Sequence, residues 1–303
     1  MGKWRGNMNR ILFEPGELCA DGTVTLADAR AEHILNVLGL GVGGVVRSGV
    51  VNGSAGTSRI IGTEGKRIRL QTDHTQPAEP SGFDLLLAAP RPKVMKRLWP
   101  QLAALGAGRV VVLNAAKVEK CYFSSQWLDP ARIRPLLIEG LAQAGTTMLP
   151  EVRVRQRFKP FVEDELGTLF PTPLRLLAHP GPVVGLAASE WPSGTRPLIA
   201  VGPEGGWTDY ERAMLTERGF RPFSLGPRTL RTDTACVALI AVLAWLRDSS
   251  RWSGGADESR VLSGRLGIGQ VAGPSCTINA ERRTENHETR TLGSLSSEAR
   301  YAD

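Results

Sequence analysis

The sequence of 303 residues is short of the residue types that build disulfide frameworks and metal centres. Its four cysteines, Cys19, Cys121, Cys236 and Cys276, lie far apart and form no C-x-x-C pair. Its four histidines show no metal-ligand spacing. These patterns argue against a disulfide scaffold or a structural zinc site and are typical of a reducing compartment. The sequence therefore favours a cytoplasmic protein with no metal in its site.

Long apolar runs are also missing. No segment approaches the roughly 20 apolar residues that a membrane-spanning helix needs, and no apolar segment follows the basic N-terminus. We therefore expect no membrane partner and no secretory signal, and translation starts at either Met1 or Met8. What the chain has in excess is positive charge, with a formal net charge of +7. Such a balance favours polyanionic partners, nucleic acid above all.

Residues 8–76 contain short strand-like runs with frequent glycine. Asn52-Gly53 is a hairpin-type turn signal between two of these runs. The pattern predicts a small β-barrel-like domain that also contains one helix. Its expected strands are 45–51, 58–61 and 67–71, and its expected helix is 27–38.

A segment with proline and serine, 77–82, predicts a linker, and the pattern changes after it. Continuous apolar runs typical of buried parallel strands then alternate with helical segments, which predicts an α/β domain with a mostly parallel sheet over 83–247. The expected strands are 84–89, 109–113, 174–178, 197–201 and 220–224, and the expected helices are 93–105, 131–144 and 208–218.

The last predicted helix, 234–247, is apolar on nearly every face. Such a helix needs burial all round, in a core or in a subunit interface. We favour the interface, and hence a homodimer, because the last helix of a domain rarely lies at its centre. Residues 248–303 have few large apolar side chains and no sustained periodicity, so we expect a disordered tail.

Three glycine-bearing segments are candidate ligand loops. Gly39, Gly41 and Gly44 match G-x-G-x-x-G, but a predicted helix precedes them and a strand follows, so we interpret them as a turn. By contrast, Gly202-Pro203-Glu204-Gly205-Gly206 directly follows an apolar strand. Ligands bind at the carboxyl ends of parallel strands, and glycine lets backbone approach a ligand closely. We favour a ligand loop over an ordinary strand-to-helix turn.

The third segment, 225–235, follows the next strand and reads LGPRTLRTDTA. Arg228 and Arg231 stand close to a single acid, Asp233. Two arginines in a loop beside a second glycine-rich loop suggest an anion or nucleic-acid site, with a surface salt bridge as the alternative.

The two loops, GPEGG and LGPRTLRTDTA, resemble the signature loops of the RsmE family. These are 16S ribosomal RNA uracil-N3 methyltransferases of the SPOUT (trefoil-knot) superfamily. The resemblance implies a knotted methyltransferase domain after a small PUA-like β-barrel RNA-binding domain. Further matching segments are Leu177–Pro180, Arg91–Lys93, Leu105-Gly106, Glu119–Phe123 and Gln143–Thr147, with Arg10, Glu32–Ile34 and Asn52-Gly53 in the small domain.

The resemblance implies S-adenosyl-L-methionine as cofactor, held by the two loops and by the segment at His179. It further suggests that Arg231 stabilises negative charge on the uracil and that Asp233 or Glu204 acts as general base. The expected cofactor-binding residues are His179, Val201, Gly202, Pro203, Glu204, Gly205, Gly206, Leu225, Gly226, Arg228 and Leu230.

Ribosomal RNA or the small ribosomal subunit is the implied partner. The chain departs from many members at Gly39 and Thr146, where an arginine is usual, and at Asp233, where glutamate is usual. Two alternatives stay open: an RNA-binding or ribosome-assembly factor without turnover, and a SPOUT methyltransferase for another nucleotide. The expected RNA contacts are Arg10, Arg91, Lys93, Lys96, Arg97, Lys117, Lys120 and Arg228.

Overall fold

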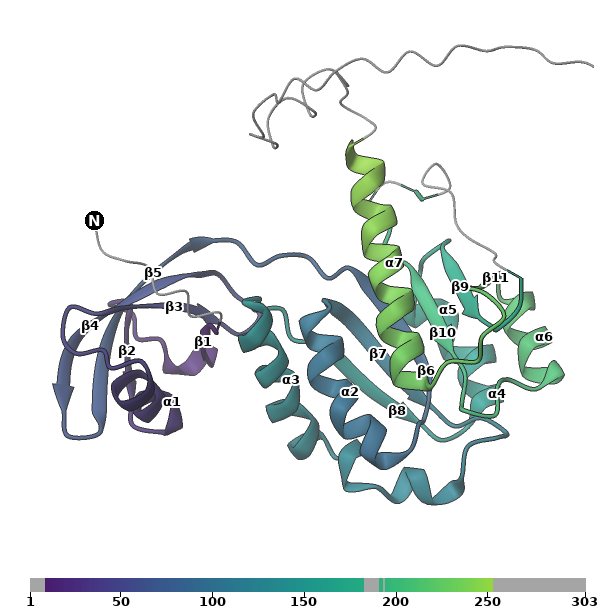
Figure 1. Cartoon of the computed structure of the whole chain (residues 1–303), viewed down its shortest axis with the longest axis horizontal. Helices are drawn as coiled ribbons and strands as arrows, with labels where there is room; N and C mark the ends of the chain where they lie inside the picture. Colours follow the sequence, from purple (N-terminus) through teal and green to yellow (C-terminus); the bar gives the residue numbers. More distant parts are fainter. Residues whose placement is uncertain (1–8, 183–190, 193, 253–303) are drawn as a thin grey trace, which may run out of the picture. The chain divides into compact units, whose positions relative to one another are not determined.

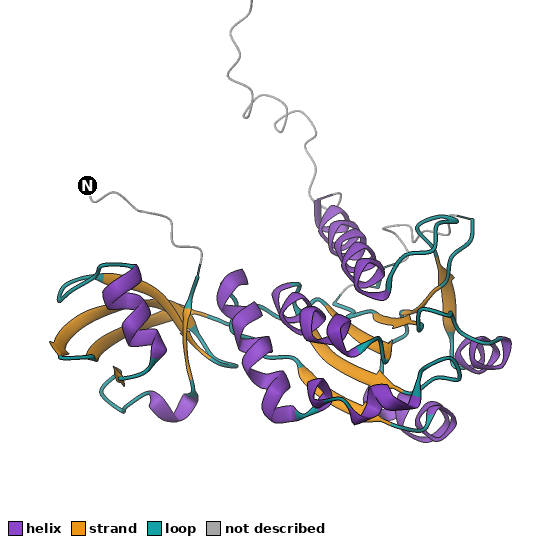
Figure 2. Ribbon diagram, turned by 60° about the horizontal axis from the view of Figure 1, so that its bottom comes forward, coloured by secondary structure: helices purple, strands orange, loops and turns teal. Residues whose placement is uncertain are grey.

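The computed structural model describes residues 9–182, 191, 192 and 194–252. It is a mixed α/β chain with two sheets (Figures 1 and 2). A five-stranded sheet has the order β1-β3-β4-β5-β2, and a six-stranded sheet has the order β11-β9-β10-β6-β7-β8. The predicted start at Met8 and the predicted tail beyond residue 252 lie outside the described residues.

The five-stranded sheet is formed by the first part of the chain. Its neighbouring strands are antiparallel, except that β1 runs parallel to β3. Asn52, with a φ of 59°, makes the predicted turn between β3 and β4. Register shifts in the β4–β5 pair bend the sheet, as such irregularities generally do. The strands are β1 (Ile11–Phe13), β2 (Thr23–Leu26), β3 (Val45–Val50), β4 (Ala55–Glu64) and β5 (Arg67–Gln76).

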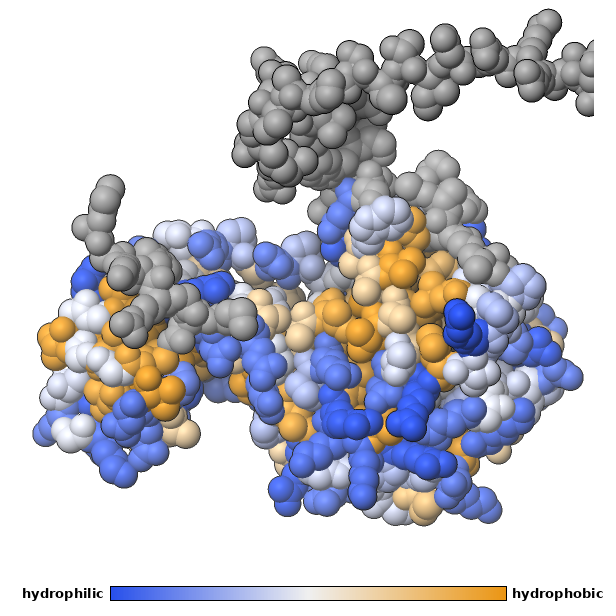
Figure 3. All heavy atoms as spheres, in the orientation of Figure 1, coloured by the Kyte–Doolittle hydropathy of each residue, from blue (hydrophilic) through white to orange (hydrophobic). Residues whose placement is uncertain are grey.

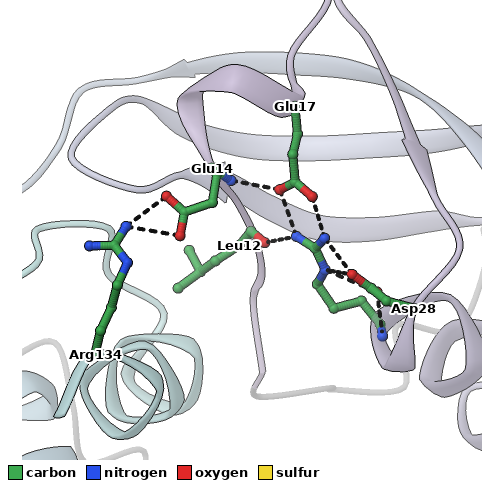
Figure 4. A network of polar contacts seen from close by, with 6 residues as sticks. Leu12, Glu14, Glu17, Asp28 and Arg134 are labelled. Carbon is green, nitrogen blue, oxygen red and sulfur yellow. Dashed lines mark hydrogen bonds and ion pairs between the residues drawn. The ribbon is translucent and has the colours of Figure 1, made fainter. Parts of the chain in front are cut away.

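A polar cluster joins this sheet to its first helix. The predicted helix 27–38 is α1 (Ala29–Glu32) continued by a π-helical turn, His33–Val37. Arg30, in α1, donates hydrogen bonds to the carboxylates of Glu17 and Asp28 and to the carbonyl of Leu12 (Figure 4). This cluster holds the helix against the edge of the sheet.

All neighbouring strands of the six-stranded sheet are parallel, in agreement with the apolar runs of the sequence. Edge strand β8 was not predicted, because its charged residues alternate with valines instead of forming an apolar run. The strands are β6 (Phe83–Ala88), β7 (Ala107–Leu113), β8 (Glu151–Arg155), β9 (Arg175–Ala178), β10 (Leu198–Val201) and β11 (Phe220–Phe223).

The main helices lie close to their predicted positions. Asp129 caps α3, and Thr208 and Glu211 form the predicted capping box of α6. Helix α7 extends to Trp252, so the expectation of disorder from residue 248 is wrong for 248–252: an apolar helix carries its last turns into a more polar segment. The helices are α2 (Pro92–Ala104), α3 (Pro130–Ala144), α4 (Phe158–Pro160), α5 (Leu166–Leu169), α6 (Asp209–Glu217) and α7 (Thr232–Trp252).

None of the helices in the described ranges has both the length and the apolar character that a membrane crossing requires.

Contacts between the β3–β4 turn and the segment after α3 explain the role of Arg10. This side chain is only 5% exposed and donates to the carbonyls of Gly145 (2.9 Å) and Ser48 (2.5 Å). Thr147 donates to the carbonyl of Gly53, and the amide of Leu149 donates to the side chain of Asn52. The prediction that Arg10 contacts RNA is therefore wrong: its guanidinium is buried and engaged by backbone oxygens.

A second contact lies at the same side of α3. Arg134 donates to both carboxylate oxygens of Glu14, at 2.9 and 2.7 Å (Figure 4). Glu14 directly follows β1, so helix α3 is tied to the five-stranded sheet in its second turn and at its C-terminal end.

Candidate functional site

A pocket of about 260 Å³ opens at the carboxyl ends of β9, β10 and β11. Its wall is formed by the loops after these strands and by the first turns of α7. The predicted cofactor residues all line it except Gly205. Apolar side chains dominate the wall, among them Trp207, Phe223, Leu225, Leu230 and Leu239. The structure thus brings the two glycine-bearing loops of the sequence into one site.

The loops after β9 and β11 are bonded to each other by backbone groups. The amide of His179 donates to the carbonyl of Phe223 (3.3 Å), and the amide of Gly181 donates to the carbonyl of Gly226 (3.2 Å). The hydroxyl of Ser224 accepts from the amide of Gly226 and lies 3.2 Å from the carbonyl of Gly181. Gly226 has a φ of 126°, a backbone conformation that only glycine adopts without strain. These bonds fix the shape of one wall.

Two glycines of the loop after β10 lie close to side chains, and a third has a left-handed backbone conformation. A Cβ at Gly202 lies 3.0 Å from Nε1 of Trp207, and a Cβ at Gly205 lies 3.0 Å from the side chain of Lys117. Gly206 has a φ of 71°. The expected reason for these glycines, close approach of a ligand, does not account for Gly205, which packs against Lys117 instead of lining the pocket.

Trp207 gives the pocket a polar atom with no protein partner. Its indole Nε1 is buried and has no hydrogen-bond partner within the part of the chain that the structure describes. Leaving a buried donor unpaired costs about 1–3 kcal/mol. An apolar wall that offers a few polar groups fits a flat, polar-edged ring such as adenine.

The loop after β7 is fastened to the loop after β10. Glu211 is only 2% exposed, and its carboxylate accepts from the amides of Ala116 (2.7 Å) and Thr208 (2.8 Å). Lys117 donates to the carbonyl of Gly205 at 2.9 Å. The loop after β7 therefore lies beside the pocket loops, although sequence separates them widely.

A group of charged residues stands at the same edge of the sheet. Nε of Arg91, in the loop after β6, lies 3.6 Å from Oε2 of Glu204, which lines the pocket. The hydroxyl of Tyr122, which follows β7, donates a hydrogen bond to a carboxylate oxygen of Glu119 at 3.2 Å. Burial raises the pKa of Tyr122, and the carboxylates of Glu119 and Glu204 raise it further. Arg91 opposes that shift.

The predicted catalytic residues separate in the structure. Glu204 lines the pocket. Arg231 is exposed and Asp233 half-buried, and neither is among the residues lining this described pocket. Asp233 instead accepts a hydrogen bond from Arg97 at 2.9 Å. This pairing engages both a predicted base, Asp233, and a predicted RNA contact, Arg97.

The remaining predicted RNA contacts divide by what they touch. Lys93 and Lys120 are exposed, and Nζ of Lys96 lies 4.8 Å above the ring of Trp127. Arg228 lines the pocket. Glu119, Tyr122 and Trp207 belong to the site by geometry but were not assigned a role from sequence. The stretch Glu119–Phe123 resembled the family, which was the available signal for two of them.

Comparison with known proteins agrees with this geometry. The family model described as an RNA methyltransferase domain matches residues 77–244. The chain is 31% identical over 255 residues to the ribosomal RNA small subunit methyltransferase E of Treponema pallidum (strain Nichols), covering 80% of this chain and 95% of the relative. It is 26% identical over 223 residues to the ribosomal RNA small subunit methyltransferase E 1 of Borreliella burgdorferi, covering 73% and 92%.

Among solved structures, the chain is similar to a ribosomal RNA small subunit methyltransferase E from Neisseria gonorrhoeae bound to S-adenosyl methionine. The TM-score is 0.63 at 24% identity, and the match covers 79% of this chain and 98% of the other. The fold is shared over nearly the whole of that protein. With the family match and the relative from Treponema, it follows that this chain belongs to the RNA methyltransferase family, among the ribosomal RNA small subunit methyltransferases E.

Proposed function

We propose that this protein transfers a methyl group from S-adenosyl-L-methionine to N3 of a uridine in 16S ribosomal RNA. The pocket at the ends of β9, β10 and β11 carries this proposal, because it joins both signature loops around an apolar space. The relatives that the chain matches along most of its length are named as small-subunit ribosomal RNA methyltransferases. One similar structure is of a protein bound to S-adenosyl methionine.

The chain's own residues fit such a donor. The apolar side chains of Leu225 and Leu230 suit the faces of the adenine ring. The bound donor supplies an electrophilic methyl group on a sulfonium. Holding it beside the acceptor in the correct orientation contributes about 7–11 kcal/mol to such transfers.

We further propose the domain division that the sequence suggests: a PUA-like β-barrel domain over 8–76, a linker over 77–82 and a knotted SPOUT domain over 83–247. In support, the five-stranded sheet ends at Gln76, the linker residues have no regular structure, and the parallel sheet begins at Phe83. The proposed cytoplasmic location follows from the RNA substrate. The exposed lysines Lys93, Lys96 and Lys120 are proposed to meet RNA phosphates, so RNA binding should weaken with salt.

A homodimer through α7 completes the proposal. One face of the helix is buried against the sheet by Cys236, Leu239, Ile240 and Leu243, while Trp245 is 67% exposed. Figure 3 shows apolar residues gathered over α7. A large exposed apolar patch marks an interaction surface.

Sedimentation velocity tests this dimer. The wild type should sediment as a dimer, Trp245→Asp as a monomer, and Tyr210→Asp, which alters an exposed aromatic on α6, as a dimer. A monomeric wild type would contradict the proposal.

Mapping of modified uridines in small-subunit RNA, from cells with and without this gene, tests the function. The proposal expects one N3-methyluridine that depends on the protein. Calorimetry with S-adenosylmethionine and its demethylated product separates the alternatives. Failure to bind either compound favours a non-catalytic RNA-binding factor. Binding together with a different modified nucleotide indicates another methyltransferase specificity.

A further inference from the structure

The donor pocket has one polar edge, and its residues come partly from strands that do not form the pocket wall. Arg91 follows β6 and Glu204 follows β10, and these two strands are parallel neighbours, with Leu198 beside Asp84. From β6 the chain continues to β7 and β8 on one side, whereas β10 lies on the other. Ligands of parallel sheets bind where the strand order reverses in this way.

The two side chains form an ion pair but no hydrogen bond with each other. The separation of 3.6 Å between Nε of Arg91 and Oε2 of Glu204 is too long for a hydrogen bond. The side chain of Arg91 is 68% exposed and that of Glu204 35% exposed, so a ligand can reach both. A guanidinium therefore stands beside the carboxylate that lines the pocket.

Residues of the loop after β7 lie beside Arg91 and Glu204 and support them. Tyr122 is buried, its hydroxyl lies 3.2 Å from Glu119, and Arg91 and Glu204 are the other charged groups that act on it. The loop itself is anchored by the bonds of Ala116 to Glu211 and of Lys117 to Gly205. Arg91 and Glu204 therefore lie beside a loop that is itself held in place by hydrogen bonds.

We propose that Arg91 and Glu204 together recognise the imide edge of the target uracil and that Glu204 removes its N3 proton. The proposal rests on the methyl-transfer function argued above. Uracil presents N3–H as a donor between two carbonyl acceptors. A carboxylate accepts from N3–H while an adjacent guanidinium donates to a neighbouring carbonyl. Cytosine offers no proton at N3, so the same pair disfavours it.

The reaction balances with these groups. The N3 proton passes to the carboxylate of Glu204, and the electron pair left on N3 forms the new bond to the methyl carbon. The bond from that carbon to sulfur breaks, and its electrons stay on sulfur, which becomes a neutral thioether. Arg91 stabilises the negative charge that spreads onto the uracil carbonyl. The proton leaves Glu204 for water after transfer.

This assignment keeps Glu204, one of the two residues first expected as general base, and puts Arg91 in the role first expected of Arg231. Asp233 is bonded to Arg97, and both Asp233 and Arg231 lie outside the described pocket wall. Arg91, first expected to contact RNA phosphate, stands beside the one carboxylate that lines the pocket in the described residues.

Glu204→Gln tests the base in the full-length protein. Glutamine keeps an oxygen that accepts from N3–H but does not take the proton. The single-turnover rate should fall about 10²–10⁴-fold and should then rise about tenfold per pH unit, because the uracil has to ionise in water first. Because Glu204 also lines the donor pocket, calorimetry first gives the affinity of the variant for S-adenosylmethionine, and the rate is measured with the donor at saturation. A variant with the wild-type rate and pH profile would overturn the proposal.

Arg91→Met tests recognition without turnover. Binding is measured in the presence of S-adenosylhomocysteine, with RNA that carries uridine or cytidine at the mapped position. The wild type should prefer uridine, and Arg91→Met should lose that preference. Arg132→Met, which removes an exposed arginine in the first turn of α3, should retain it. Equal weakening of both RNAs by Arg91→Met would reduce Arg91 to a phosphate contact and overturn the proposal.

These outcomes are separable from failure of the function itself. A wild type that neither binds S-adenosylmethionine nor methylates RNA contradicts the proposed function. A wild type that methylates a uridine, but whose Glu204→Gln and Arg91→Met variants behave as wild type, contradicts only the roles of Glu204 and Arg91.

Discussion

The two sides of the site are built in different ways. The donor side, after β9, β10 and β11, consists of backbone groups, positive-φ glycines and apolar side chains within one stretch of chain. The opposite side, at Arg91, Glu119 and Tyr122, consists of charged and polar side chains from the loops after β6 and β7. Shape dominates the first side and charge the second. Substitutions on the first side should therefore change donor affinity, and substitutions on the second side should change recognition of the acceptor and the rate of methyl transfer.

On the donor side, the largest effect, a loss of affinity for S-adenosylmethionine, is expected from Gly202→Leu. Its Cβ meets the indole of Trp207 at 3.0–3.2 Å, and overpacking of this kind costs about 1–3 kcal/mol. Calorimetry should show affinity for S-adenosylmethionine reduced by about tenfold or more. Gly167→Leu, at an α5 position with no atom within 4 Å of an added Cβ, is the matched control and should bind normally. Unchanged affinity in Gly202→Leu would show that Trp207 does not shape the donor site.

A smaller effect is expected from Asp233→Asn. This change removes the pairing with Arg97, whose side chain is 61% exposed, and such pairs contribute about 0.2–1 kcal/mol. The melting temperature should shift slightly, and the single-turnover rate of methyl transfer should change by less than about tenfold. Loss of a general base would instead lower that rate by about 10²–10⁴-fold. Arg97→Met should behave in the same way. A loss of transfer as large as that of Glu204→Gln would return Asp233 to the role of base.

The smallest effect on the site is expected from Glu17→Gln, in the five-stranded sheet. Hydrogen bonds from Arg30 lower the pKa of Glu17 below its ordinary value of 4.5 (Figure 4). The carboxylate therefore stabilises the folded state above pH 4.5, and this contribution is lost as the pH falls through the lowered pKa.

Urea unfolding of the two proteins measures this contribution. At neutral pH the variant should be less stable by about 1 kcal/mol, since the pair is partly screened by solvent. The difference should disappear in acid, and donor affinity should stay at the wild-type value. A difference that persists unchanged at low pH would contradict this account of Glu17.

The donor side was predictable from sequence, whereas the opposite side required the fold. GPEGG follows an apolar strand and precedes a capping box, so local signals placed it at the end of β10 and before α6. Nothing local places Arg91 beside Glu204, because their proximity depends on β6 and β10 being neighbours. Arg10 shows another limit: resemblance to an RNA-binding domain suggested an RNA contact, but in the fold this side chain is buried and donates to the turn after α3.

The central claim, that shape on one side holds the donor and charge on the other acts on the acceptor, is tested most directly by one titration. S-adenosylmethionine is titrated into Gly202→Leu and Arg91→Met under the same conditions. The account predicts weakened binding by Gly202→Leu and wild-type binding by Arg91→Met. Equal weakening by both variants, or weakening by Arg91→Met alone, would contradict it.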